Sequence, residues 1–222
     1  MALLSISEAI CAGAGHYCYA EVGSHLGGSL QPHVRDPRCT KIYSIDPRPL
    51  EQPDDRWTFK YRYEGNSTER MLELLSAIPG ADTAKIQTFE ASSWDLAQDS
   101  MAEPADFVFI DGEHTNTAVI RDFIAMRRFL SPLAVMAFHD CFVTPAAFLK
   151  IARMLRSENR THWIKYFPRS NVVAIVFDPS LNAQLQNLGW QDGLPVTALD
   201  AVKIMVNKRF SWAVKIVRKL KG

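Results

Sequence analysis

Short apolar runs alternate along the chain with longer amphipathic stretches, a pattern typical of strands separated by helices. Residues 107–110 are apolar without a break, as expected of a parallel strand that is buried on both faces. Residues 66–75 instead carry apolar side chains at helical spacing after a polar capping sequence, and Pro79 and Gly80 end this helix. The same criteria predict seven strands, at residues 17–22, 40–46, 85–89, 107–110, 133–138, 163–167 and 172–177. They predict helices at residues 5–14, 66–75, 116–130, 145–156 and 202–220, with a short helix after the turn at residues 23–29.

The order of these elements predicts an α/β fold. Strands alternate with helices through most of the chain, and the turn residues 168–171 join the last two strands as a hairpin. We therefore expect a doubly wound, Rossmann-like, mostly parallel seven-stranded sheet that ends in an antiparallel hairpin, with helices on both faces. Residues 1–199 are assigned to this domain, and residues 200–222 to a basic amphipathic C-terminal helix that is part of the same domain or peripheral to it. Residues 57–63 are predicted as a short edge strand or an ordered loop.

A glycine-rich turn follows the first predicted strand, from Glu21 through Gly23 and Gly27 to Ser29. Glycine lets a backbone approach a ligand closely, because it lacks a Cβ and tolerates positive φ. The spacing fits neither the G-x-G-x-x-G dinucleotide fingerprint nor the phosphate-binding P-loop. It therefore indicates a loop for a cofactor that needs no phosphate cradle. His25, within the turn, is interpreted as a solvent-facing or backbone-capping side chain.

Polar residues follow five of the predicted strands. Ligands of open α/β sheets bind beyond the carboxyl ends of the strands, so these residues are candidates for a site. Strand ends face solvent and are polar in any case, which explains any single position but not the residue types. The candidates are Glu21, Asp46, Ser92, Ser93, Trp94, Asp111, Glu113, His114, His139 and Asp140.

Asp46 lies 19 residues after Gly27, close to the spacing at which an acidic residue binds ribose hydroxyls in dinucleotide folds. The alternative is an Asp that forms a turn with Pro47. Because a cofactor loop precedes it, we favour the ribose-binding role.

The acids and histidines after the fourth and fifth strands can support transfer of a group to a hydroxyl. A hydroxyl is a poor acid, so a base that titrates near neutral pH helps to remove its proton, and histidine suits this role. A divalent metal can polarise the same oxygen. Asp111 and Asp140 are suitable oxygen ligands for Mg²⁺.

These motifs together resemble a known family. The order E-x-G-x-x-x-G-x-S at residues 21–29, FVFIDGEH at 107–114 and AFHD at 137–140 resembles the class I S-adenosylmethionine (SAM) methyltransferases. Among them it is similar to the bacterial enzymes related to macrocin- and mycinamicin-type sugar O-methyltransferases. The resemblance covers residues 17–178 by motif order, and the combination of motifs is more specific than any one of them.

The resemblance implies SAM as the cofactor and assigns roles to the candidate residues. It places Glu21, Gly23 and Gly27 at the methionine part of SAM, Asp46 at the ribose, and Ser92, Ser93 and Trp94 at the adenine, with Ser24, Ser29 and Asp111 also at the cofactor. It implies a catalytic base at Glu113 or His114. It also implies a Mg²⁺ site at Asp111, His139 and Asp140, although the family has an acid where this chain has His139. Because Mg²⁺ prefers harder ligands than imidazole, His139 is alternatively a base or a substrate contact.

The resulting functional hypothesis is a SAM-dependent O-methyltransferase acting on a sugar, a glycan or a natural-product glycoside. An NAD-dependent oxidoreductase of similar fold is the first alternative, against which the glycine spacing and the lack of a Tyr-x-x-x-Lys pair argue. A non-catalytic binding module that keeps the fold is the second. The acceptor is expected to be a small molecule or glycan.

Composition indicates which partners and which cellular compartment to expect. The 222 residues carry a net charge of +1, which gives no signal for a nucleic-acid partner. Four cysteines without a C-x-x-C pair favour a reduced, cytoplasmic protein. The first eight residues lack the basic region of a signal peptide, and no apolar run reaches the length of a transmembrane helix.

The C-terminal segment differs from the rest in charge. Residues 200–222 hold seven basic residues against Asp200 alone, so the remainder of the chain is net negative. Such a helix can lie on the anionic inner face of a membrane, and it can equally pack on the domain or on a second subunit as a homodimer. Its apolar residues at helical spacing are Val206, Phe210, Ala213, Val214, Val217 and Leu220.

Overall fold

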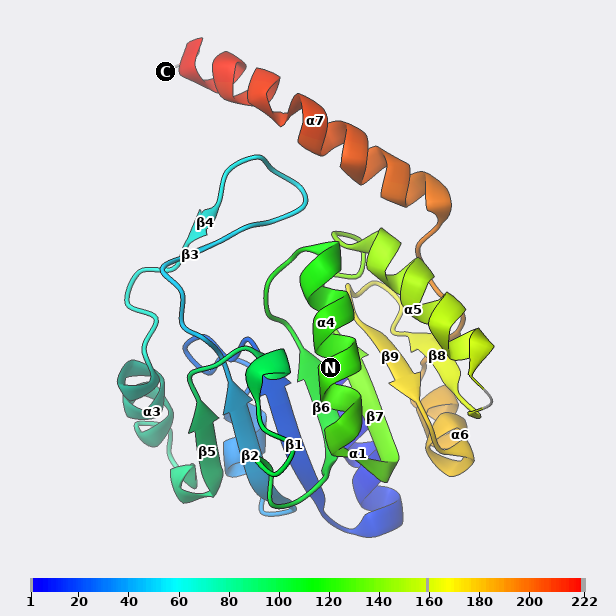
Figure 1. Cartoon of the computed structure of the whole chain (residues 1–222). Coiled ribbons are helices and arrows are strands. Elements are labelled where there is room, and N and C mark those ends of the chain that lie inside the picture. Colours follow the sequence, from blue (N-terminus) through cyan, green and yellow to red (C-terminus); the bar gives the residue numbers. More distant parts are fainter. Residues whose placement is uncertain (1, 159, 221–222) are drawn as a thin grey trace.

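The computed structural model describes residues 2–158 and 160–220, with the backbone alone for residues 210–220. Its centre is an eight-stranded sheet in the order β10-β8-β9-β7-β6-β1-β2-β5 (Figure 1). The strands are β1 Tyr17–Val22, β2 Cys39–Ile45, β5 Ile86–Phe89, β6 Ala105–Ile110, β7 Leu130–Phe138, β8 Trp163–Tyr166, β9 Val173–Val176 and β10 Gln191–Asp192.

The strand directions confirm a largely parallel sheet that ends in antiparallel strands. β5, β2, β1, β6 and β7 run parallel to one another, and β9 then pairs antiparallel with both β7 and β8. The prediction of seven strands was wrong by one, because β10 adds a two-residue antiparallel partner to β8. Two residues show no alternation of apolar and polar positions, so the sequence pattern could not reveal this strand.

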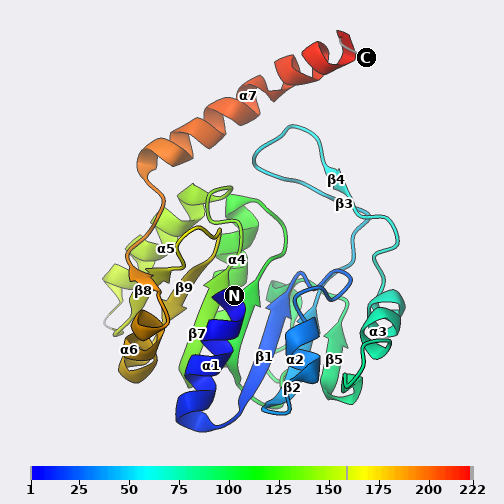
Figure 2. The same ribbon diagram turned by 180° about the vertical axis from the view of Figure 1, so that it is seen from behind.

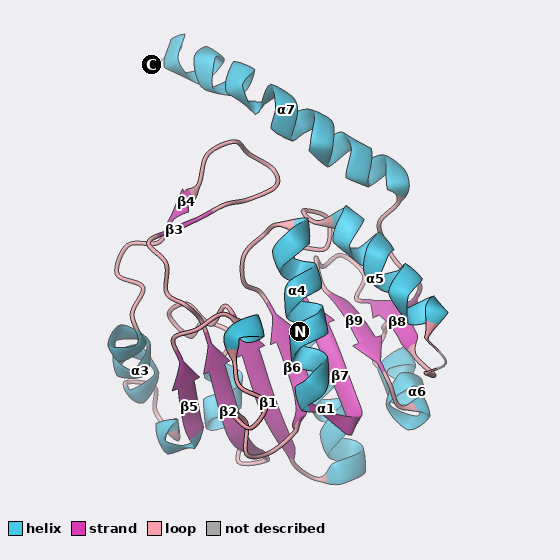
Figure 3. Ribbon diagram, viewed as in Figure 1, coloured by secondary structure: helices cyan, strands magenta, loops and turns pink. Residues whose placement is uncertain are grey.

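Helices cover both faces of the sheet (Figures 2 and 3). Buried residues of α1, α2, α3 and α6 pack on one face, and those of α4 and α5 on the other. The pattern did not predict α6, which Asp178 caps by accepting a hydrogen bond from the backbone N–H of Leu181. The helices are α1 Ala2–Ala14, α2 Gln31–Arg35, α3 Thr68–Ser76, α4 Asn116–Met126, α5 Pro145–Ser157, α6 Pro179–Asn187 and α7 Ala198–Leu220.

The central strand β1 shows why both faces need helices. Every residue of β1 is buried, and successive side chains point to opposite faces. Ala20 and Val22 join the core beneath α4 and α5, whereas Tyr17 and Tyr19 join the core beneath α1 and α2. Burial of a side chain the size of Val22 contributes roughly 1.5–3 kcal/mol. A strand with water on either face would lose this contribution on that side.

The segment after β2 leaves the sheet and folds on itself. Its strands β3 (Glu51–Gln52) and β4 (Tyr61–Arg62) pair antiparallel as a separate two-stranded unit. Of the predicted segment 57–63, only Tyr61 and Arg62 are therefore in a strand, and that strand is not an edge of the main sheet. Trp57 and Phe59 stack with ring centroids 5.4 Å apart, which orders the loop between the two strands.

The C-terminal helix α7 lies over the end of the sheet to which the parallel strands point (Figures 1 and 2). It begins at Ala198, ahead of the predicted start, and contacts α5. Within the described part of the chain, no helix combines the length and the apolar character that a membrane crossing needs.

Candidate active site

The centre of the sheet opens a crevice between the loops after β1 and β6. After β1 the chain continues to β2 on one side, and after β6 it continues to β7 on the other side. The two loops therefore leave their strands in opposite directions. Gly23 lies where these loops touch. Its φ is +88°, and a Cβ there would be 2.3 Å from the carbonyl oxygen of Asp111 and 2.5 Å from the Cα of Gly112. Only glycine fits this backbone contact, which brings the two loops together at the base of the crevice.

The glycine turn is held from below by Glu21. The Glu21 side chain is fully buried and accepts hydrogen bonds from the hydroxyl groups of Tyr19, at 2.6 Å, and Ser29. Burial raises the pKa of Glu21 to about 8, although these two hydrogen bonds act in the opposite direction. Glu21 thus joins the two ends of the turn and faces Tyr19 and Ser29. Its predicted contact with a cofactor stays a prediction.

Arg48 holds the other side of the turn and was not identified from the sequence. Its guanidinium is almost fully buried and donates to the carbonyl oxygen of His25 and, at 2.8 Å, to the side-chain oxygen of Asn66. The predicted Ser24 lies beneath it, with its hydroxyl 2.6 Å from that of Ser44. The sequence around Arg48 does not reveal that it holds the turn, because its partners His25 and Asn66 are distant in sequence.

Asp46 lies at the end of β2, as predicted, and its carboxylate borders the crevice. One carboxylate oxygen accepts the backbone N–H of His25 and the other that of Arg48, each at 2.8 Å. A carboxylate oxygen can accept two hydrogen bonds, so both retain capacity for a ligand. The hydrogen bond from Arg48 spans Pro47 and is the turn given as the alternative, so Asp46 does form this turn. Its role at ribose hydroxyls stays a prediction, with which the remaining capacity of the carboxylate agrees.

Two adjoining pockets make up the crevice, which we call the switch-point cleft. They share Gly23, Asp46, Gln52 and Gly112. The first pocket, of about 210 Å³, brings together Ser92, Ser93, Trp94, Glu113 and Asp122. The second, of about 180 Å³, brings together His25, Tyr63, Asn66, Asp111 and His114.

The first pocket contains a carboxyl group that the sequence analysis missed. Asp122 lies within α4, is buried, and accepts a hydrogen bond of 2.5 Å from the hydroxyl of Ser93. Burial raises the pKa of Asp122 to about 7. A carboxyl near this pKa can accept or donate a hydrogen bond at the pocket wall. Its position in mid-helix, far from any strand end, hid it from the search for polar residues after strands.

The second pocket ends in a cluster of two histidines and three carboxylates. His114 lies between acids, with its Nδ1 3.3 Å from Asp54 and its Nε2 3.3 Å from Asp140 and 3.6 Å from Asp111. The Nδ1 of His139 is 3.1 Å from the same Asp111 oxygen. The ends of β6 and β7 and the segment after β2 thus meet in one ionic network, which we call the His114 cluster.

The carboxylates set the charge of the histidines. Burial alone would lower the pKa of His114, but the hydrogen bonds with Asp111 and Asp54 and the negative charge of Asp140 raise it to about 9. The hydrogen bond with Asp111 likewise raises the pKa of His139. The imidazolium of His114 in turn holds the pKa of Asp54 below its usual range, against the effect of burial. At neutral pH His114 is therefore protonated in the free protein.

The predicted residues divide between the two pockets. His114 and Asp111 lie together at the second pocket, and His139 and Asp140 join them through the cluster. Glu113 instead lines the first pocket, and its carboxylate accepts a hydrogen bond of 2.7 Å from the hydroxyl of Thr115. The geometry thus separates the two predicted bases and favours His114.

The proposed metal ligands were tested against the geometry of the cluster. Asp111, His139 and Asp140 do come together, but His114 lies between the two carboxylates where a shared cation would lie. Across residues 2–158 and 160–209, no group of three His, Cys, Asp or Glu side chains has an arrangement that could hold a metal ion. The residues as arranged do not fit Mg²⁺.

Unusual backbone conformations also gather around this cleft. His25, Arg48 and Asp140 have φ values of 44°, 54° and 50°, in the left-handed region that is uncommon for residues with a Cβ. Such residues concentrate at functional sites, where surrounding contacts hold them in place. His25, interpreted as solvent-facing or backbone-capping, is half-buried, lines the second pocket and packs edge-on against Tyr63.

The chain is similar to known proteins both in sequence and in fold. Residues 20–141 match a family described as a methyltransferase domain. The structure is similar to the calicheamicin methyltransferase CalS11, with a TM-score of 0.59 and 14% identity over 80% of this chain and 77% of that one. It is similar to the O-methyltransferase TomG from Streptomyces achromogenes, with a TM-score of 0.54 and 15% identity over 80% of both chains. An rRNA methylase from Streptococcus thermophilus gives a TM-score of 0.54 and 11% identity over 80% of this chain and 94% of that one. No curated protein matches the chain.

Proposed function

The chain belongs to the methyltransferase-domain family, and from this membership we propose that it transfers a methyl group from SAM to a hydroxyl of a sugar, glycan or natural-product glycoside. Two similar structures support parts of this proposal. TomG is an O-methyltransferase described in complex with SAM, and CalS11 is a methyltransferase of calicheamicin. The rRNA methylase of the same fold shows that the fold alone does not determine the acceptor.

The residues of the switch-point cleft fit SAM. When bound, SAM supplies a methyl group on a sulfonium that a nucleophilic oxygen can accept. Asp46 would hold the ribose through the free capacity of its carboxylate, and Gly23, which lines both pockets, would lie beside the methionine part. Ser93, Trp94 and Asp122 offer hydrogen-bonding groups and an aromatic face for the adenine.

The single observation that carries O-methylation is the position of His114 at the end of this cleft, among three carboxylates. A sugar hydroxyl does not ionise at neutral pH, so its proton must leave as the oxygen attacks. SAM would supply the methyl carbon to the attacking oxygen, and the hydroxyl proton would pass to the neutral form of His114, which is the minor form at neutral pH because its pKa is about 9. Asp111 and Asp140 then stabilise the imidazolium that results.

Two variants test the cofactor and base roles separately. Titration calorimetry with S-adenosylhomocysteine is expected to show binding to the wild-type chain. Loss of charged hydrogen bonds should weaken this binding about 10- to 100-fold in Asp46→Ala. The variant His114→Gln should keep the affinity but lose about 10²–10⁴-fold in kcat.

The outcomes distinguish the possible functions. Lack of S-adenosylhomocysteine binding would refute the cofactor, and binding without turnover on any acceptor would favour a non-catalytic module. Wild-type turnover in His114→Gln would remove His114 as the base. Mass spectrometry of the product identifies the methylated atom, and methyl transfer to nitrogen alone would refute O-methylation.

A further inference from the structure

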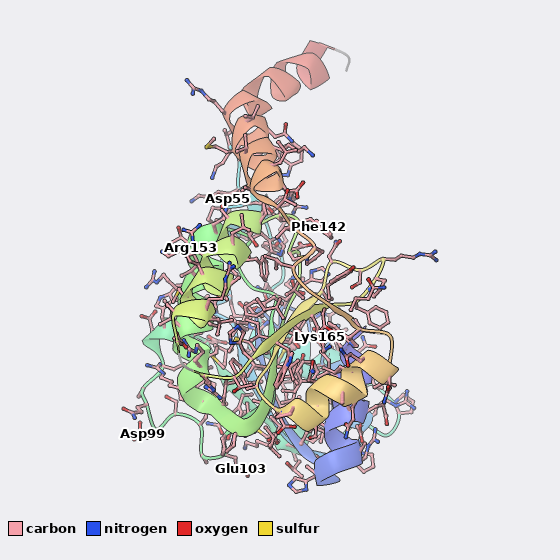
Figure 4. The ribbon with its side chains drawn as sticks, turned by 90° about the vertical axis from the view of Figure 1, so that its right-hand side faces the viewer. Asp55, Asp99, Glu103, Phe142, Arg153 and Lys165 are labelled. Atoms are coloured by element: carbon pink, nitrogen blue, oxygen red, sulfur yellow. The ribbon has the colours of Figure 1, made fainter. Side chains whose placement is uncertain are left out.

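We propose that α7 docks the protein on an anionic lipid surface. The helix runs over the end of the sheet where the switch-point cleft lies, and beyond its first turns it extends away from the body (Figures 1 and 4). Residues of its first turns line a cavity against the body, and other residues of these turns are apolar and exposed.

The side of α7 that faces the body is identified by three residues at helical spacing. Ala201, Ile204 and Lys208 are half-buried and line a cavity of about 350 Å³ against the start of α5. The ammonium group of Lys208 is 2.7 Å from the carboxylate of Asp55. This side is therefore already occupied by the protein itself.

Exposed apolar residues lie away from this cavity. Leu199 and Val206, two helical turns apart, are 62% and 43% exposed, and Val202 between them is 48% exposed at the edge of the cavity. In the sequence the spacing continues at Phe210, Ala213, Val217 and Leu220, whose side chains lie outside the described part of the chain. Apolar residues that recur in sequence along a projecting helix, here called the apolar stripe, indicate an interaction site, because contiguous exposed apolar surface, unlike single exposed apolar residues, marks such sites.

Charge identifies the partner at this site. Residues 200–222 contain seven basic residues against Asp200 alone. Among the described ones, Lys203 and Arg209 are exposed, and Lys203 lies 3.6 Å from the carboxylate of Asp200. An anionic bilayer attracts such a helix at its headgroups and receives the apolar stripe at the boundary with the acyl chains. A second copy of α7 would instead bring two strongly basic segments together. The lipid surface satisfies both the apolar and the charged part of the helix.

The inference is tested with the full-length chain and vesicles, without methyl donor or acceptor. Co-sedimentation is expected with vesicles that contain phosphatidylglycerol, and little with pure phosphatidylcholine. Raising the salt from about 0.05 M to about 0.5 M should release most of the bound protein, because screening weakens the attraction to headgroups.

A matched pair of variants isolates the stripe. Leu199→Glu with Val206→Glu should reduce partition to phosphatidylglycerol vesicles about tenfold or more. Ile124→Glu with Leu133→Glu adds the same charge at exposed apolar positions of α4 and β7, and should leave partition within about twofold of that of the wild-type chain. Circular dichroism and S-adenosylhomocysteine binding confirm that each variant is folded.

Three results would overturn the inference: no binding to anionic vesicles, equal loss in both variant pairs, or a solution dimer that Leu199→Glu with Val206→Glu dissociates. The last would show that a second copy covers the stripe. Because the vesicle assay contains no reaction, its failure leaves the proposed methyl transfer intact. A chain that binds vesicles but never methylates an acceptor would support lipid docking and refute the proposed methyl transfer.

Discussion

Replacement of Gly23 by alanine should damage both stability and cofactor binding. The new Cβ would lie 2.3 Å from the carbonyl oxygen of Asp111, and this neighbour is backbone that cannot rotate away. The left-handed φ of +88° adds about 1–2 kcal/mol for a residue with a Cβ. Overpacking adds about 1–3 kcal/mol, so we expect a total loss of about 2–5 kcal/mol.

Two neighbouring glycines provide matched controls. Gly27 has a similar φ of +81°, but an added Cβ would meet the movable side chains of Leu75 and Met71 at 3.0–3.1 Å. Gly27→Ala should therefore cost mainly the backbone strain of about 1–2 kcal/mol. Gly28 has open space around it and no positive φ, and Gly28→Ala should be neutral or stabilising by up to about 1 kcal/mol.

Urea denaturation of the three variants measures these differences directly. In thermal unfolding of a chain of this size, each kcal/mol of lost stability lowers Tm by about 2–4 °C. A loss of about 3 kcal/mol in Gly23→Ala would therefore lower Tm by about 6–12 °C. Calorimetry should also show weaker S-adenosylhomocysteine binding for Gly23→Ala than for Gly28→Ala. If Gly23→Ala is no less stable than Gly27→Ala, the two loops do not meet backbone to backbone and the described base of the cleft is wrong.

Three further predictions concern the titrating groups. Because only neutral His114 can accept a proton, kcat/KM should rise with pH toward about 9, the pKa of His114 in the free enzyme. A profile already flat between about pH 6 and 7 would contradict this role. The pKa of Asp122 is about 7 in the folded state, above its unfolded value of about 3.9, so the folded state binds the extra proton and stability should fall as pH rises between these values. Asp122→Asn should flatten that dependence in urea denaturation at pH 5 and 8 (roughly the two sides of the upper pKa), and an unchanged slope would show that another group titrates. Because His114 lies between Asp111 and Asp140, turnover should persist in EDTA, whereas loss that Mg²⁺ restores would show that the cluster rearranges around a metal.

The sequence pattern predicted the parts of the fold and site that local order determines. Parallel buried strands are continuous apolar runs, and the residues directly after them were found by position, which is how Asp46 and His114 were identified. Asp54 could not be found in this way. It lies in the irregular segment after β2, about 60 residues from His114, and only the folded chain shows that they are 3.3 Å apart. Arg48 and Asp122 were missed for the same reason, since their partners come from other elements.

The adjacent carboxylates of Asp54 and Asp55 connect two parts of the molecule through a single peptide unit. Asp54 contacts His114, and Asp55 contacts Lys208 of α7 while its backbone N–H donates to the carbonyl oxygen of His114. A displacement of α7 that moves Asp55 therefore reaches the imidazole within one residue. If binding of α7 to a surface alters this displacement, that binding and the protonation of His114 are coupled. By thermodynamic reciprocity, each then changes the free energy of the other by the same amount. The proton affinity of the base thereby becomes a reporter of what α7 touches.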